Sequence, residues 1–311
     1  RPWDYQRSRG SLAWTLNEEA FTLVAPYLQV EGEEGKLAGD FLIRLMRDPE
    51  AEDYMDLRVG LSEGDARYTE KYLPTRSPAL SPALSEWLTA AIREGIVEQG
   101  YFQYQGSLNK SAVDTARSLS LYFKVRDADF AFQPGWPALR EGRGEVLIED
   151  DQVRVRLAEG RMLDSRVHHV LARIPLRQGE RPLRLAIEGQ VEAGLRDALT
   201  LMQVAPIGTA DLFAGWRGEG ALSGSLKLDI PLAAGKAPKV EVEFSSADAS
   251  LYIPQADLQL GALSGDFRYD SERGLSASRI SASALGSPIS GKASATSTPG
   301  KPATRIEAGG V

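Results

Sequence analysis

Two neighbouring histidines are the residues of this chain best suited to act as a general base or as metal ligands. His168 and His169 are its only histidines. Imidazole nitrogens exchange protons near neutral pH and bind transition metals. The pair lies in a strand-like run, where successive side chains point to opposite faces of a sheet. We therefore expect the two rings to lie apart, with no shared metal and no active site between them.

Other motifs that commonly support catalysis are absent from the sequence. The chain has no cysteine, which excludes disulfides, iron–sulfur clusters, thiolate zinc sites and a cysteine nucleophile. It contains no Gly-x-Ser-x-Gly turn, and the glycine-rich stretch 215–220 lacks the spacing of a phosphate-binding loop. We predict that the chain is not an enzyme and holds no metal and no cofactor.

The net charge of the chain limits the kind of partner that it can bind. The 311 residues include 36 Lys and Arg against 43 Asp and Glu, a net charge of −7. Binding to nucleic acid normally needs a basic face, so we expect no nucleic acid partner. Apolar residues make up 42% and charged residues 25%, as in ordinary folded proteins.

Apolar and mainly charged residues alternate strictly in four segments, which predicts strands with one apolar and one charged face. The apolar members, which we call the predicted lining, are Val153, Val155, Leu157, Leu183, Leu185, Ile187, Leu226, Leu228, Ile230, Val240, Val242 and Phe244. The charged members are Arg154, Arg156, Arg184, Glu188, Lys227, Asp229, Glu241 and Glu243. Weaker alternation occurs at residues 12–16, 41–45, 57–61, 119–125 and 267–269.

The elements that must position these residues are mainly antiparallel strands joined by short turns. Helical spacing predicts two short amphipathic helices, near residues 82–94 and 195–203. Residues 129–167 resemble residues 248–289, which indicates a duplicated β unit. We expect a first segment over residues 1–205 and a second over 206–311 that continues the same sheet and is truncated at its C-terminus.

The apolar face of such a sheet must be hidden from water. A second sheet would cover it in a sandwich, and a closed barrel would fill its own interior. A third solution is an open, curved sheet whose apolar face lines a groove occupied by lipid. The strand pattern does not separate these three, although the duplicated unit favours the third.

Several motifs, in order and spacing, resemble the central region of the AsmA-like family, most closely its YhdP branch. They are Tyr72-Leu73-Pro74, Trp87-Leu88-x-x-Ala91-Ile92-x-x-Gly95, Gly100-x-x-x-Tyr104-x-Gly106, Phe132-x-Pro134-Gly135-Trp136-Pro137-Ala138-Leu139, Gly189-x-Val191-x-x-Gly194-x-x-x-Ala198-Leu199 with Pro206, and Leu222-Ser223-Gly224-x-Leu226-x-Leu228. The resemblance covers residues 40–295.

This resemblance implies a fold and a function. It implies a mostly β protein: an elongated, strongly twisted and curved antiparallel sheet with an open hydrophobic groove and two or three short amphipathic helices. It also implies a periplasmic segment of a bridge-like protein that carries phospholipid between inner and outer membranes. An N-terminal anchor in the inner membrane would lie outside this segment. We expect acyl chains to contact the predicted lining.

Two alternatives from other functional classes remain open. One is a non-catalytic envelope scaffold or assembly factor that binds outer-membrane or periplasmic proteins. The other is a carbohydrate-binding sandwich, for which Trp136 and Trp216 are the candidate aromatic platforms. Both tryptophans lie in stretches rich in Gly and Pro, where packing is the more common role.

Overall fold

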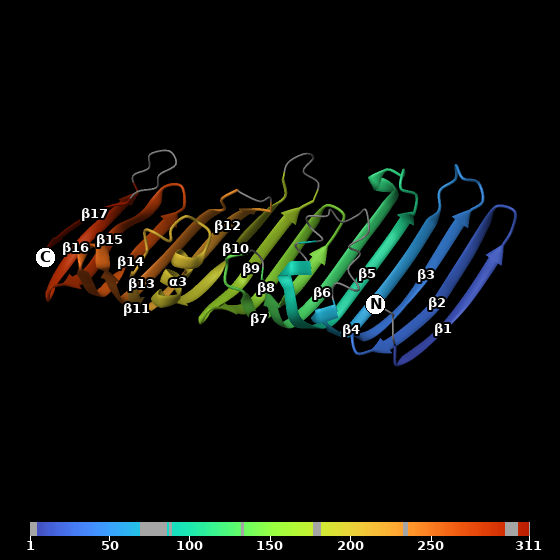
Figure 1. Cartoon of the computed structure of the whole chain (residues 1–311), viewed down its shortest axis with the longest axis horizontal. Helices are drawn as coiled ribbons and strands as arrows, with labels where there is room; N and C mark the ends of the chain where they lie inside the picture. Colours follow the sequence, from blue (N-terminus) through green and yellow to red (C-terminus); the bar gives the residue numbers. More distant parts are fainter. Residues whose placement is uncertain are drawn as a thin grey trace. The chain divides into compact units, whose positions relative to one another are not determined.

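The protein is a single open β-sheet with little helix (Figure 1). The computed structural model describes residues 5–68, 86, 89–131, 134–176, 182–232, 236–295 and 304–310. Its 17 strands belong to one antiparallel sheet that does not close. The open sheet confirms the predicted fold class, and the sandwich and the closed barrel are wrong. Two compact units divide the chain, and each is described by itself.

The first unit comprises Arg1–Phe130, Glu141–Arg156 and Pro175–Arg177. Its six leading strands form a meander in which each strand pairs with the next. They are β1 (Arg7–Leu16), β2 (Ala20–Gly32), β3 (Gly35–Met46), β4 (Tyr54–Asp65), β5 (Ile92–Ser107) and β6 (Arg117–Phe130). Short 3-10 helices, η1 (Ala66–Tyr68) and η2 (Asp114–Ala116), follow β4 and precede β6. Residues of β7 (Leu139–Ile148), β8 (Gln152–Met162) and β9 (Ser165–Pro175) are divided between the units.

The second unit comprises Ala131–Arg140, Leu157–Ile174 and Gln178–Val311. Its strands are β10 (Arg184–Gly194), β11 (Arg217–Glu219), β12 (Ala221–Pro231), β13 (Lys239–Ile253), β14 (Leu258–Asp270), β15 (Gly274–Ala284), β16 (Ser287–Ala295) and β17 (Thr304–Gly310), with η3 (Pro254–Ala256) before β14. The first half of β13 pairs with β12 and its second half with β11. A buried cluster of four alanines, a leucine and a phenylalanine forms its core: Ala249, Leu263, Phe267, Ala277, Ala282 and Ala293.

The predicted helices have different outcomes. Helix α3 (Leu195–Val204) forms where the pattern placed it, directly after β10. In the predicted helix near 82–94, residues 86 and 89–91 are helical, and residues 82–85, 87 and 88 lie outside the described residues. The end of that prediction is wrong, because β5 begins at Ile92. Ile92 and Ile96 pair with β6, so hydrogen bonding to a neighbouring strand overrides the helical spacing.

The two segments compared as a duplicated unit have the same order of elements, and the duplication itself stays a prediction. Residues 129–167 run from the end of β6 through β7 and β8 into β9, and residues 248–289 run from the end of β13 through β14 and β15 into β16. The hairpin turns of the two repeats contain Leu163, with φ 56°, and Leu285, with φ 50°. The predicted boundary near residue 205 does not follow from these repeats or from the two compact units, and it stays a prediction.

Candidate functional site: an apolar sheet face

Most of the predicted lining shares one face of the second unit. Residues directly opposite each other in an antiparallel pair lie on the same face. Leu185 faces Ile230, and Ile187 faces Leu228. Leu228 in turn faces Val240. One row further, Leu226 faces Val242. In the row beyond, Phe244 stacks on Phe267 with ring centroids 5.1 Å apart. We call this side, carried by β10 and β12–β14, the apolar face of the second unit.

The remaining members of the predicted lining lie on β8 or just before β10. On β8, Val153 is buried, and Val155 and Leu157 are half-buried, alternating with Arg154 and Arg156. Leu183 precedes β10, and its carbonyl accepts a hydrogen bond from the Leu232 amide at 2.9 Å. Contact between these residues and a lipid stays a prediction.

Exposure divides the apolar face into packed and accessible positions. Ile230 is 0% exposed, Leu185 3% and Val240 4%, so neighbouring side chains already cover them. Ile187 and Leu228 are half-buried, as are Leu226, Val242 and Phe244. Only the half-buried positions are accessible without unpacking the sheet.

Tyr269 is a polar side chain buried among these apolar residues. It lies opposite Val242 on one side and Leu275 on the other, and is 7% exposed. Burial raises the pKa of its hydroxyl above the ordinary value of 10.0, with a smaller contribution from Asp270. The phenol therefore stays neutral at any physiological pH and adds no charge to the apolar face.

A second apolar face lies on the first unit, and the predicted lining omits it. One row runs from Phe41 through Leu57 and Tyr104 to Leu119. The rows beside it contain Leu23, Ile43, Met55, Val59, Phe102 and Leu121. We call these residues the apolar face of the first unit. The weaker alternation at residues 41–45, 57–61 and 119–125 was the signal that could have identified it.

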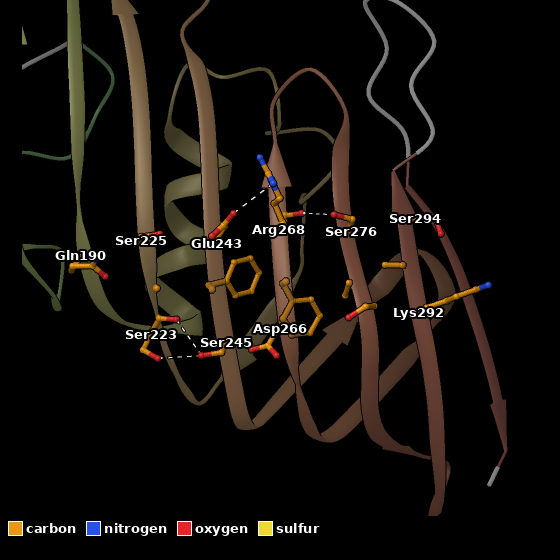
Figure 2. Close-up of a pocket in the computed structure, with 16 residues that line it drawn as sticks. Gln190, Ser223, Ser225, Glu243, Ser245, Asp266, Arg268, Ser276, Lys292 and Ser294 are labelled. Carbon is orange, nitrogen blue, oxygen red and sulfur yellow. Dashed lines mark hydrogen bonds and ion pairs between the residues drawn. The ribbon is translucent and has the colours of Figure 1, made fainter.

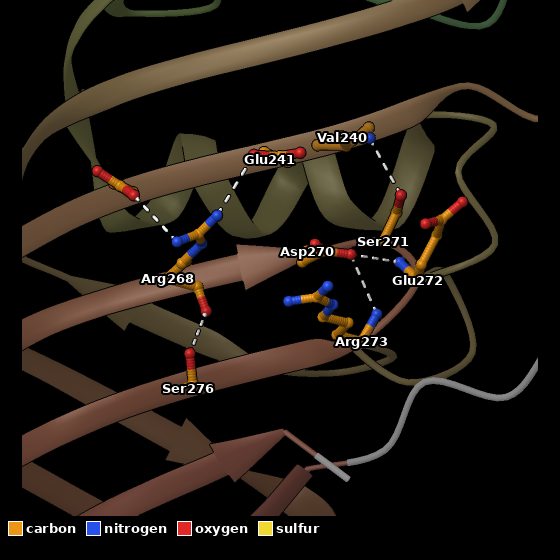
Figure 3. Close-up of polar contacts among 9 residues, drawn as sticks. Val240, Glu241, Arg268, Asp270, Ser271, Glu272, Arg273 and Ser276 are labelled. Atoms are coloured by element: carbon orange, nitrogen blue, oxygen red, sulfur yellow. Dashed lines mark hydrogen bonds and ion pairs between the residues drawn. The ribbon is translucent and has the colours of Figure 1, made fainter. Parts of the chain in front are cut away.

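The opposite side of the sheet in the second unit is charged and paired. The guanidinium of Arg184 lies 2.7 Å from a carboxylate oxygen of Asp229 on the neighbouring strand. The guanidinium of Arg268 lies 3.5 Å from a carboxylate oxygen of Glu241 (Figure 3) and 3.6 Å from one of Glu243. Such exposed pairs contribute little stability, but they keep one side of the sheet hydrated. Apolar side chains can then lie along the other side of the same strands.

A shallow open pocket of about 820 Å³ crosses the second unit (Figure 2). Its residues occupy three consecutive positions along each of the strands β12–β16, and each position forms a row across the sheet. The two outer rows are polar. One outer row contains Gln190, Ser225, Glu243, Arg268 and Ser276, and the other contains Ser223, Ser245 and Asp266. The middle row contains Gly224, Phe244, Phe267 and Ala277. Phe244 is the member of the predicted lining among these residues, so this pocket does not settle the role of the others.

Helix α3 lies against the apolar side of the second unit. Leu195 packs against the buried cluster, and a Cβ atom added to Gly218 of β11 would lie 2.5 Å from its side chain. Asp197 accepts hydrogen bonds from the Asp164 amide at 2.9 Å and from the Ser165 hydroxyl at 2.6 Å. The helix is therefore fixed at both the β8–β9 turn and β11, and covers the apolar side there.

The expected separation of the two histidines is wrong. The Nδ1 atoms of His168 and His169 lie 3.0 Å apart, and the ring centroids are 5.0 Å apart. His169 has φ 50°, and the pairing of β9 with β10 shifts register at this point. This β-bulge breaks the alternation, so consecutive side chains come together. Within the described residues, no group of three or more His, Cys, Asp or Glu side chains is placed to hold a metal ion.

The two candidate aromatic platforms are used in packing. Trp136 is 9% exposed, next to a turn in which Gly135 lies against Pro206. Trp216 packs edge-on against Phe213, and its indole nitrogen donates to Gln255 Oε1 at 2.9 Å. Neither forms the exposed flat surface that stacking on a sugar requires. In the described part of the chain, no helix is long and apolar enough to cross a membrane.

These features define a class of protein: an open antiparallel sheet with one apolar and one hydrated face. Comparison with known proteins shows the family to which this chain belongs. Its whole length, residues 1–311, matches the family model described as YhdP protein, so the chain belongs to the YhdP family. It is 23% identical over 283 residues to the intermembrane phospholipid transporter YhdP of Escherichia coli (strain K12).

That alignment covers 86% of this chain and 21% of the relative. The chain therefore spans about a fifth of the length of the curated relative that it matches. No solved structure matches it.

Proposed function

We propose that this chain is a periplasmic segment of a phospholipid conduit, in which acyl chains lie along the apolar face of the sheet. In the full-length protein the segment would be tethered to the inner membrane and would pass lipid toward the outer membrane. The observation that carries the proposal is the set of half-buried apolar side chains on an open sheet that no second sheet covers within the described residues. The family relation and the name of the relative support phospholipid as the cargo.

The apolar face supplies what such transport needs. Exposing an acyl chain to water costs about 0.8 kcal/mol per CH₂ group, or about 12 kcal/mol for a sixteen-carbon chain. Continuous contact with Leu226, Leu228 and Val242 removes much of that cost. Along a uniform row of aliphatic side chains, the binding free energy of a lipid has no deep minimum, so the lipid can move. No chemical step is required of the protein.

The direct test is lipid capture by the purified chain, followed by mass spectrometry of lipid extracted from it. Leu228→Asp places a carboxylate at an accessible position of the apolar face and should reduce bound phospholipid several-fold, since burying a charge against acyl chains is strongly unfavourable. Gln190→Asp, on the polar face of the adjacent strand, is the matched control and should leave it unchanged. Circular dichroism should show that both variants fold.

The test also separates the conduit from an envelope scaffold. A scaffold would bind proteins through strand edges or the polar face, and its apolar face would serve packing alone. Leu228→Asp would then unfold the chain without any lipid having been bound by the wild type. A folded wild-type chain that carries no phospholipid would overturn the conduit.

A further inference from the structure

One cation of the first unit lies in line with the apolar face and not on the polar side. Arg117 is the first residue of β6 and pairs with Gly106. Gly106 pairs with Met55, and Met55 with Ile43, so Arg117 continues a row of the apolar face. Leu119 lies two residues further along β6, on the same face. Arg117 thus marks the end of that face where β6 begins.

The guanidinium of Arg117 is held by neutral groups. Its Nη2 atom donates to the carbonyl of Ala112 at 3.0 Å and to that of Asn109 at 3.4 Å. Its Nε atom is buried and has no hydrogen-bond partner within the described part of the chain. No carboxylate lies within ion-pair distance of it among the described residues, whereas Arg58 on the polar face lies 2.8 Å from Asp40. Among the described residues, Arg117 therefore has an unpartnered Nε–H donor and no counter-charge.

The loop that holds Arg117 is itself fixed. Asn109 accepts a hydrogen bond from the Asp53 amide at 2.9 Å and donates to the carbonyl of Ala51 at 3.2 Å. The Asp53 carboxylate in turn accepts from the Met46 amide at 2.8 Å. Gly106 has φ 133°, and a Cβ atom there would lie 2.2 Å from the Ala116 carbonyl, so only glycine allows β6 to begin so close to β5. The position of the cation is set before any ligand binds.

We propose that Arg117 binds the phosphate of a phospholipid whose acyl chains lie on the apolar face of the first unit. A guanidinium offers planar paired donors that match phosphate oxygens. A phosphodiester supplies the missing negative charge, and the adjacent row of Leu119, Tyr104 and Leu57 receives the tails. Arg117 would then distinguish phospholipid from an uncharged lipid with the same tails. This inference rests on the proposed function.

The experiment compares two lipids with identical acyl chains, phosphatidylglycerol and diacylglycerol, on the purified chain. Arg117→Gln should weaken retention of phosphatidylglycerol about tenfold, the effect expected for losing a charge-assisted hydrogen bond, and leave diacylglycerol unchanged. Arg117→Lys keeps the charge and should recover part of the difference. Arg58→Gln, on the polar face, is the matched control and should alter neither lipid.

A measurement on the wild type covers the case in which Arg117→Gln does not fold. The ¹⁵N signal of the Arg117 Nε–H group, assigned by its loss in Arg117→Lys, should shift with short-chain phosphatidylglycerol and much less with glycerol phosphate alone. An equal shift with both would show a free-phosphate site and overturn the lipid assignment. Undiminished phosphatidylglycerol retention by a folded Arg117→Gln would overturn this inference alone. Failure of the wild type to retain either lipid would overturn the proposed function and this inference with it.

Discussion

At the scale of single residues, the two hairpin turns of the duplicated unit carry a leucine in the left-handed region. Leu163 has φ 56° and Leu285 has φ 50°, each just before the third strand of its repeat. A β-carbon in this region costs roughly 1 kcal/mol, and asparagine and glycine tolerate it better. The side chain of Leu285 is 96% exposed, so no packing offsets the cost. The two turns thus share a backbone conformation that leucine does not favour locally.

Leu285→Asn should therefore raise stability by roughly 0.5–1 kcal/mol, because it relieves backbone strain without removing a buried contact. The measurement is the urea midpoint of the transition that includes β15 and β16, followed by hydrogen exchange. Leu163→Asn is the comparison. It should raise stability less, because Leu163 is 38% exposed and its replacement removes some packing. A lower midpoint for Leu285→Asn would contradict the assignment of strain.

The sequence pattern identified the apolar face of the second unit because charged residues such as Lys227 and Glu241 stand between its aliphatic ones. It missed the face of the first unit, where Ala38, Gly60 and Tyr101 occupy the opposite side and weaken the contrast. The alternation pattern also does not predict a β-bulge at a residue other than glycine. The close approach of the His168 and His169 rings therefore could not be predicted from it. The orientation of Arg117 depends on its register with Gly106, which only the paired strands reveal.

At the scale of elements, helix α3 is attached to the sheet by a few specific contacts. Asp197 in its first turn accepts two hydrogen bonds from the β8–β9 turn, one of them from the 7%-exposed Ser165. Beside it, Arg196 forms an ion pair with Glu219 at 2.7 Å in which both side chains are about three-quarters exposed. A part-buried polar contact and an exposed ion pair of the same helix can therefore be compared directly.

Asp197→Ala should weaken docking of α3 by about 1–2 kcal/mol, since it leaves the Ser165 hydroxyl and the Asp164 amide without their acceptor. Hydrogen exchange of the α3 amides should accelerate while that of β13 and β14 stays unchanged. Arg196→Gln removes only the exposed pair and should change exchange little. Equal acceleration in both variants would show that Asp197 has no special part in docking.

At the scale of the whole molecule, the central feature is an open sheet whose two units each carry an apolar face. Sandwiches and barrels bury such faces against further protein. Here the packed positions, such as Ile230, coexist with accessible ones, such as Leu228 and Leu57, on strands whose other side is hydrated. An apolar ligand could shield these accessible positions from water, and the proposed function takes that ligand to be phospholipid.

Site-specific photo-crosslinking in cells tests this claim most directly. A photoreactive side chain would be placed at Leu57 and Leu228 on the apolar faces, and at their chain neighbours Arg58 and Lys227 on the polar side. We expect phospholipid to be captured at Leu57 and Leu228 and to be absent at Arg58 and Lys227. Capture at none of the four positions, or equal capture at all of them, would contradict the account.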